Sequence, residues 1–155
     1  ATVLSCIDSR AAPELVFDQG IGDIFSPRVA GNFLNDDILG SMEFASKVAG
    51  SRLIVVLGHS SCGAIKGACD KVQLGYVSAL VKELQPAVEA VPDDGLERTS
   101  KNTAFVEKVA QANVEITVKE IVDRSEILRD MASKGQIKVV GAMLDVETGK
   151  VAFIE

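Results

Sequence analysis

The sequence predicts an α/β fold, with an open, mostly parallel central sheet flanked by helices and a C-terminal hairpin strand. Two short runs, "TVLSC" (2–6) and "RLIVVLGH" (52–59), are rich in apolar and β-branched residues, as in parallel strands covered on both faces. Helical patterns alternate with these runs, which is typical of α/β chains. Near the end, "IKVVGAMLDVETGKVAFI" (137–154) contains two strand-like runs about "ETGK", which predicts a hairpin.

The first elements follow from turn and breaker residues. After the strand over 2–6, proline at a first helical position and glycine at a C-terminal one predict a short helix from Pro13 to Gly20. "DIFSPRV" (23–29) predicts a second strand. Since Pro27 has no amide hydrogen for a ladder, this strand should lie at or near a sheet edge.

The middle of the chain predicts helices on either side of the strongest strand, 52–59. A helix over 35–50 has an acidic first turn, a glycine stop and an apolar face of Ile38, Leu39, Met42 and Ala45. Two helical stretches follow, 61–72 and 76–90, and Pro86 should kink the second.

The remaining elements are a loop, two helices and the hairpin. Residues 91–102 form a loop by composition. A long amphipathic helix is predicted over 102–123, with Phe105, Val109, Ala112, Ile116 and Val122 close to one face. Ser125 should cap a short helix that Gly135 ends. No repeat or linker interrupts this order, so we expect residues 1–155 to form a single domain.

Composition excludes several classes of protein. The 155 residues are 47% hydrophobic with a net charge of -6, and no basic block offers a nucleic-acid footprint. The longest apolar runs are far shorter than the roughly 18–20 residues of a membrane span. No signal peptide opens the chain, and three cysteines are too few for a disulfide framework. We therefore expect reduced thiols and a cytoplasmic location.

Chemically reactive residues gather at predicted strand ends. Cys6 ends the first strand and His59, the single histidine, ends the third. If the first strand lies between the second and the third, the strand order reverses between Cys6 and His59, where ligands bind in parallel sheets. Cys62 follows three residues after His59 and can enter the same volume.

Two thiolates and one imidazole suit zinc, whose catalytic sites keep three protein ligands and an open fourth position. An isolated "HxxC" is a weak signal, because a lone histidine beside a strand is more often a hydrogen-bonded core residue. The joint placement of Cys6, His59 and Cys62 favours zinc. Cys69, in an ordinary helical stretch, is expected to be a small packing residue.

Asp8 has three possible roles: a fourth zinc ligand in a closed state, a partner of the zinc-bound water, or a residue at a helix entry. Arg10, two residues on, can hold the carboxylate in a bidentate pair, and this favours the second role. The fourth-ligand role remains open.

The blocks "CIDSR", "RVAGN", "GHSSCGAI" and "DVETGKV" resemble the signature blocks of the β-class carbonic anhydrases, in the same order from residue 2 to the C-terminus. The resemblance implies one zinc per chain, bound by Cys6, His59 and Cys62, with Asp8 and Arg10 as a gating dyad. It also implies a homodimer or higher oligomer whose interface forms the carbon dioxide pocket, with Phe25, Ala30 and Phe44 at the matching positions.

The implied activity is zinc-dependent carbonate dehydration, in which a zinc-bound hydroxide converts carbon dioxide reversibly to bicarbonate and a proton. Ser5, Ser9 and Asn32 are candidates for supporting hydrogen bonds around the site.

Three features depart from the family pattern. Family members carry an N-terminal helical arm that wraps the partner subunit, and we expect this domain to lack it. Tryptophan is absent, so the tryptophan-containing bicarbonate pocket of one subgroup cannot form in its usual way. A histidine proton shuttle is not evident, because His59 has no second histidine beside it.

Alternative functions remain. The nearest is a hydrolase of carbon disulfide or carbonyl sulfide on the same zinc scaffold, since substrate choice depends on the shape of the access path. A non-catalytic, zinc-stabilised binding module would keep a closed site with four ligands. A thiol redox protein ranks last, because the chain has no C-x-x-C.

Overall fold

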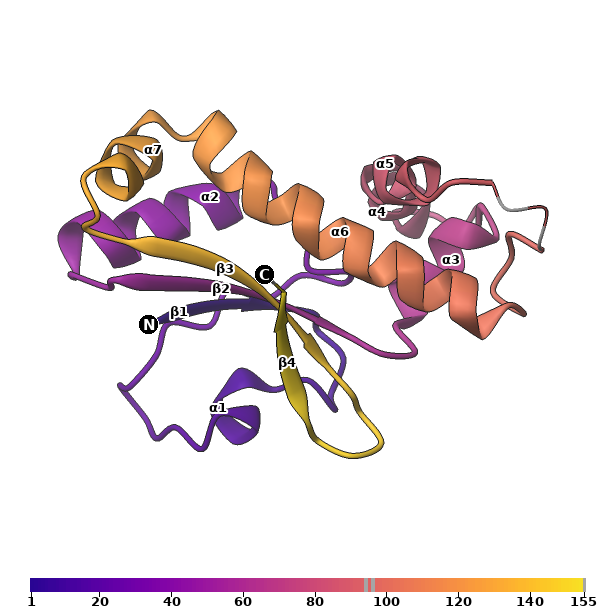
Figure 1. Ribbon diagram of the computed structural model, residues 1–155, viewed down its shortest axis with the longest axis horizontal. Helices are drawn as coiled ribbons and strands as arrows, with labels where there is room; N and C mark the ends of the chain where they lie inside the picture. The colour runs from indigo at the N-terminus through magenta and orange to yellow at the C-terminus, as the bar shows by residue number, and fades with distance from the viewer. Residues whose placement is uncertain (94, 96, 155) are drawn as a thin grey trace.

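The computed structural model describes residues 1–93, 95 and 97–154, which build one four-stranded sheet with helices around it (Figure 1). The strand order is β1-β2-β3-β4. β1 pairs with β2 and β2 with β3 in parallel, whereas β3 and β4 are antiparallel. The strands are β1 (Thr2–Ser5), β2 (Leu53–His59), β3 (Lys138–Leu144) and β4 (Val151–Ile154). The predicted α/β class, with a mostly parallel sheet and a terminal hairpin, is confirmed.

The predicted strand over 23–29 is wrong in extent but right in position. This segment makes only two isolated parallel bridges to β1, at Phe25 and Arg28. The backbone N–H groups of Val3 and Ser5 donate to the carbonyls of Phe25 and Pro27 at 2.8 and 3.2 Å. The segment therefore lies beside β1, on the edge opposite β2, and Pro27 has no N–H with which to continue a ladder.

Because of this arrangement, β1 lies between the 25–28 segment and β2, and the order of the strands along the sheet reverses there, as expected, while all three segments run parallel. Ser5 is in register with Leu57. Cys6 follows β1 directly and His59 ends β2, so both residues stand at the same, carboxyl edge of the sheet.

The helices agree with the predicted ones apart from their ends. The first helix is a single turn that stops before Gly20, because Asp18 adopts a positive φ of 51°. The 76–90 stretch breaks at Leu84, two residues before Pro86. The bounds are α1 (Pro13–Val16), α2 (Asp36–Glu43), the π-helical turn η1 (Phe44–Val48), α3 (Gly63–Cys69), α4 (Val77–Glu83), α5 (Gln85–Ala90), α6 (Thr103–Arg124) and α7 (Glu126–Ser133).

Side-chain hydrogen bonds fix several helix starts. The Oδ1 atoms of Asn35 and Asn102 accept backbone N–H groups in the first turns of α2 and α6. Ser125 caps α7 in the same way, as predicted. In the predicted loop 91–102, positions 94 and 96 lie outside the described residues.

The two faces of the sheet are covered differently (Figure 1). α2, α6 and α7 cover one face, where their apolar residues pack on Leu4, Ile54 and Val56. The other face, with Val3, Val55 and Leu57, packs against α1 and the residues that follow it. Successive residues of β1 and β2 point to opposite faces of the sheet, and both faces are covered. This explains why the two strands are unbroken apolar runs. No helix in the described part of the chain is long and apolar enough to cross a membrane.

α6 approaches the end of β2 very closely. A Cβ atom added at Gly58 would lie 2.5 Å from Cγ2 of Val114 and 2.7 Å from Sδ of Met143. A Cβ at Gly141 of β3 would lie 2.7 Å from Cγ1 of the same valine. Glycine at both positions therefore lets the long helix lie directly on the strands beside the candidate site.

Candidate metal centre

Cys6, His59 and Cys62 form a buried cluster at the carboxyl edge of the sheet. One ligand atom of each lies within 4.8 Å of the others. The residues are 4%, 1% and 1% exposed. Cys6 follows β1, His59 ends β2 and Cys62 precedes the first turn of α3. The pairing of β1 with β2 brings Cys6 near His59, although the two residues are far apart in sequence.

The tight turn between His59 and Cys62 is held by hydrogen bonds to the hairpin. The Ser60 N–H donates to the carbonyl of Leu144 at 2.8 Å, and the Ser60 hydroxyl accepts the N–H of Val146 at 3.0 Å. Ser61 adopts a left-handed φ of 54°. The chain thereby reverses quickly enough for His59 and Cys62 to share one cluster.

The imidazole of His59 is oriented for metal binding. Nδ1 lies 2.9 Å from the Ser60 carbonyl oxygen, which can only accept, so Nδ1 carries the proton and Nε2 presents a lone pair. Nε2 is buried and has no hydrogen-bond partner among the described residues. A buried polar atom needs a partner, and a metal ion held by Nε2 and the two sulfurs would supply one.

The surroundings of the two sulfurs favour a thiolate at Cys6 and a neutral thiol at Cys62. Sγ of Cys6 accepts backbone N–H groups from Gly31 at 3.3 Å and from Asp8 at 3.4 Å. A hydrogen bond from the Cys62 thiol lowers the pKa of Cys6, and the same bond together with burial raises the pKa of Cys62. Burial acts to lower the pKa of His59, but the neighbouring Cys6 sulfur outweighs it and raises that pKa. This set of two sulfurs and one nitrogen fits zinc, one ion per chain.

Asp8 lies beside the cluster and is held by Arg10. Nε and Nη2 of Arg10 donate to the two carboxylate oxygens of Asp8 at 2.9 and 2.8 Å, and the Arg10 backbone N–H adds a third bond at 3.0 Å. These bonds hold the pKa of the Asp8 carboxyl well below its usual range. Asp8 does not cap a helix, because the residue at the N-terminus of α1 is Ala12.

The residues predicted for a carbon dioxide pocket do not gather at the cluster within one chain. Phe25 pairs with the start of β1 at Thr2, roughly 13 Å along the strand from Cys6. Phe25 and Phe44 line a separate groove of about 540 Å³ and are 40% and 57% exposed. Ala30 lies nearer the cluster, since it precedes Gly31, whose N–H donates to Cys6.

The residues proposed for supporting hydrogen bonds have different surroundings. The Ser5 hydroxyl donates to the Cys6 carbonyl rather than to its sulfur, and Ser9 is exposed. Asn32 is 2% exposed with a left-handed φ of 41°, and its Nδ2 has no partner among the described residues.

The structure also reveals site residues that sequence reasoning missed. Nε of Arg28 donates to the carbonyl of Cys6 at 2.9 Å and Nη2 donates to that of Asp8 at 2.7 Å. This guanidinium fixes the backbone that carries both side chains. Its signal in the sequence was its place at the head of "RVAGN", one of the blocks that carry the family resemblance.

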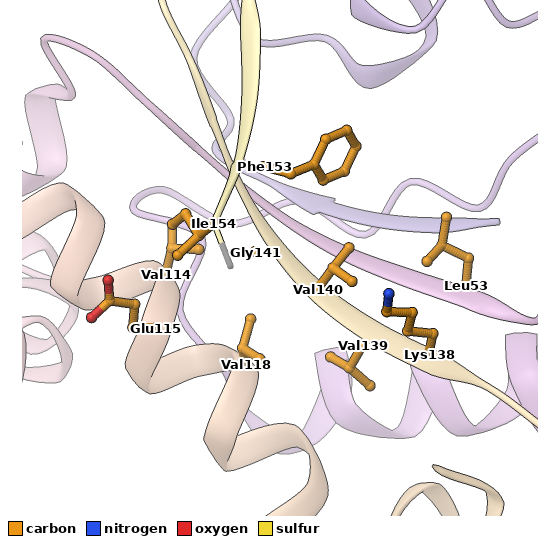
Figure 2. Close-up of a pocket in the computed structure, with 10 residues that line it drawn as sticks. All are labelled: Leu53, Val114, Glu115, Val118, Lys138, Val139, Val140, Gly141, Phe153 and Ile154. Atoms are coloured by element: carbon orange, nitrogen blue, oxygen red, sulfur yellow. The ribbon is translucent and has the colours of Figure 1, made fainter. Parts of the chain in front are cut away.

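A larger cavity, of about 650 Å³, lies away from this chemistry (Figure 2). Val114, Glu115 and Val118 of α6 form one side of it, and the hairpin strands β3 and β4 form the other. Its lining includes no member of the metal cluster, so size alone does not identify the candidate site.

Comparisons with known proteins agree with the cluster. A protein-family model described as carbonic anhydrase matches residues 1–151. Carbonic anhydrase 2 of Mycobacterium tuberculosis is 36% identical over 155 residues, which cover 97% of this chain and 72% of that protein. The carbonic anhydrase of Synechococcus elongatus is 31% identical over 159 residues, covering 97% of this chain and 58% of that one.

Solved structures show the same fold. The β-carbonic anhydrase CcaA superimposes with a TM-score of 0.88 at 25% identity, covering 99% of this chain and 78% of that one. CafA of Aspergillus fumigatus gives a TM-score of 0.86 at 24% identity, with 99% and 74% coverage. The family match over nearly the whole chain, the relatives and the buried cysteine–histidine–cysteine cluster lead to one conclusion: this chain belongs to the β-class carbonic anhydrases, which are lyases.

Proposed function

We propose that this carbonic anhydrase hydrates carbon dioxide reversibly to bicarbonate and a proton at the Cys6–His59–Cys62 centre, with Asp8 and Arg10 as its catalytic dyad. The observation that carries the proposal is the buried three-ligand cluster with an ionised carboxylate fixed beside it. Three protein ligands leave one position open for chemistry.

The ligands have distinct roles in this proposal. Sγ of Cys6, Sγ of Cys62 and Nε2 of His59 would hold the zinc ion, while the bond from Nδ1 to the Ser60 carbonyl keeps the ring in the required tautomer. When bound, zinc acts as a Lewis acid that lowers the pKa of water and so provides a nucleophile for carbon dioxide.

Asp8 would accept a hydrogen bond from the attacking water and direct its lone pair toward the substrate carbon. Arg10 keeps Asp8 ionised and correctly oriented through its bidentate contact. The reaction consumes one water and releases one proton. Since the single histidine is a metal ligand, the proton would leave through water or buffer.

The Asp8–Arg10 ion pair supports the open form, in which Asp8 is not a zinc ligand, as the active form of the site. Because both oxygens of Asp8 accept hydrogen bonds from Arg10, a closed state with Asp8 as a fourth ligand would require this ion pair to break or turn. We therefore assign the closed form to conditions in which the pair is disrupted.

The proposal includes a homodimer or higher oligomer in which a second chain completes the substrate pocket. Phe25 and Phe44 leave apolar surface exposed, and so do Ile7, Leu15 and Ile21 in neighbouring segments. Two relatives from Sordaria macrospora are described as tetrameric. Residues 1–155 would act as one catalytic domain, and the three free thiols suit a reducing compartment such as the cytoplasm.

The direct test is stopped-flow hydration of carbon dioxide by the purified, zinc-loaded protein, compared with hydrolysis of carbonyl sulfide and carbon disulfide. We expect carbon dioxide to be turned over fastest. Faster turnover of either sulfur compound would reassign the substrate. Failure to turn over any of the three, with zinc bound, would favour the non-catalytic zinc module.

A further inference from the structure

The long helix α6 forms hydrogen bonds with two backbone segments that adjoin the metal ligands. These segments are the Gly31 loop (30–32), which donates to the Cys6 sulfur, and the Ser61 turn (60–62), which joins His59 to Cys62. None of the sequence patterns pointed to α6 as part of the site. The contacts come from two polar side chains on its N-terminal half.

The first contact runs from Asn113 to Cys6 through Gly31. Nδ2 of Asn113, which is 4% exposed, donates to the Gly31 carbonyl at 2.8 Å. The N–H of Gly31 in turn donates to Sγ of Cys6 at 3.3 Å. Asn113 is therefore linked to Cys6 through a single residue, Gly31. Its hydrogen bond fixes the orientation of the Gly31 N–H that donates to the Cys6 sulfur.

The Gly31 loop needs a contact of this kind to hold its backbone in place. Gly31 has a φ of +83°, and an added Cβ would lie 2.8 Å from Cδ1 of Leu84. Gly31 thus passes close to Leu84 and has no side chain with which to anchor its own position. Asn113 supplies the anchor from outside, in a place where an apolar residue would leave the Gly31 carbonyl without this partner.

The second contact joins Glu107 to the Ser61 turn. Oε1 of Glu107 accepts the Ser61 N–H at 2.9 Å. Ser61 has the strained left-handed φ of 54°, and its carbonyl lies 3.5 Å from Nη2 of Arg10. One carboxylate on α6 therefore holds the turn that spaces His59 from Cys62.

α6 is a rigid support for these contacts. Val114, the residue after Asn113, packs against Gly58 and Gly141 with no space for a further atom, and Figure 2 shows this valine beside the strands. A movement of α6 toward the sheet would therefore bring Val114 into steric overlap with β2 or β3.

From this geometry we propose that Asn113 and Glu107 are positioning residues of the metal centre, which set the spacing and hydrogen bonding of its ligands through Gly31 and Ser61. The inference rests on the proposed zinc site but concerns residues that never touch the ion. It follows that each side chain contributes to metal affinity and to the electronic environment of the sulfurs, separately from its contribution to stability.

The test compares four variants of the full chain. Asn113→Leu and Glu107→Leu remove the two contacts. Thr117→Val is the matched control for Asn113, because Thr117 is 1% exposed one turn further along α6. Glu107→Gln is the matched control for Glu107, because its amide oxygen can still accept the Ser61 N–H.

Two readouts do not depend on turnover: zinc affinity by competition with a chromophoric chelator, and the sulfur-to-cobalt charge-transfer bands of the cobalt-substituted protein. We expect both leucine variants to bind zinc about 10- to 100-fold more weakly and to shift the bands. Thr117→Val should leave the affinity and the bands unchanged, and Glu107→Gln should retain the affinity and the spectrum of the wild type.

The inference is overturned if the leucine variants bind zinc as tightly as the wild type with unchanged cobalt bands, or if Glu107→Gln is as impaired as Glu107→Leu. Glu107 is only half-buried, so its variants decide the matter if Asn113→Leu does not fold. A wild type that binds no zinc would instead refute the proposed function, and this inference with it.

Discussion

Oδ2 of Asp8 lies 4.0 Å from Nε2 of His59, while both oxygens of the same carboxylate accept hydrogen bonds from Arg10. The Asp8 carboxylate is thus held next to the metal centre by the Arg10 guanidinium and not by the side chains of the metal ligands. Metal binding and catalysis should therefore be separable at this position.

Asp8→Ala should retain zinc and lose turnover. Removing a group that orients the attacking water typically lowers the rate by about 10²-fold or more. Zinc stoichiometry and stopped-flow hydration of carbon dioxide measure the two effects on one sample. Asp130→Ala, which removes an exposed carboxylate from its pair with Lys134, is the control and should keep full activity. Undiminished turnover in Asp8→Ala would remove Asp8 from the mechanism.

His59→Ala and Cys62→Ala should each lose zinc, because two remaining ligands bind the ion too weakly to keep it through purification. Metal analysis after dialysis checks this. Cys69→Ala is the matched control, since Cys69 is also a buried free cysteine but lies outside the cluster. A full zinc complement in either ligand variant contradicts the assignment.

Gly58→Ala should destabilise the fold by about 1–3 kcal/mol, because the new methyl group would overlap Val114 and Met143. Urea unfolding measures the free energy. Adding Val114→Ala should recover part of the loss, so the double variant loses less than the sum of the single ones. Gly40→Ala is the control: nothing lies within 4 Å of a Cβ there, and alanine in the helix should leave stability equal or slightly raised. Strict additivity would refute the steric explanation.

Asp70 should stabilise the fold only while it is ionised. The hydroxyl and the N–H of Ser100 donate to its carboxylate at 2.5 and 2.8 Å, which lowers the pKa of Asp70 in the folded state. The stabilisation is then complete above the unfolded pKa of about 3.9 and is lost as the pH falls through the lower, folded value.

We therefore expect Asp70→Ala to lower the melting temperature at neutral pH, with a difference from wild type that shrinks in acid. Ser100→Ala should act similarly, and the two changes together should cost less than their sum. A pH-independent difference in melting temperature would contradict this origin of the effect.

Phe44→Glu should shift the assembly toward single chains, because a carboxylate in the proposed apolar interface would be buried without a partner. Sedimentation velocity measures the change. Leu74→Glu, at a residue that is 65% exposed elsewhere, is the control and should leave the oligomer intact. If Phe44→Glu sediments like the wild type, the proposed interface is wrong.

The sheet and most helices could be predicted from the sequence because their signals are local. The apolar runs of β1 and β2 reflect burial of both faces, and Asn102 and Ser125 mark helix starts through their own side-chain hydrogen bonds. The segment 23–29 looked like a strand because its composition is strand-like, but a ladder needs continuous N–H donors and Pro27 interrupts them.

The cluster itself was visible in the sequence because Cys6 and His59 stand at strand ends and only one histidine competes for the role. Its surroundings were not visible. Asn113 lies 82 positions from Gly31, and Glu107 lies 46 positions from Ser61, so only the packed tertiary structure brings them together. The helical pattern over 102–123 gave no separate signal for Asn113.

The order of these residues along the chain has a consequence for biosynthesis. A ribosome delivers Cys6, His59 and Cys62 before it has made the helix whose Glu107 and Asn113 contact their loops. Until residue 124 and the third strand have emerged, the nascent polypeptide carries two thiols and an imidazole on unsupported turns. We therefore expect stable loading of the metal to follow synthesis of α6 and β3, when both loops have gained their supporting contacts.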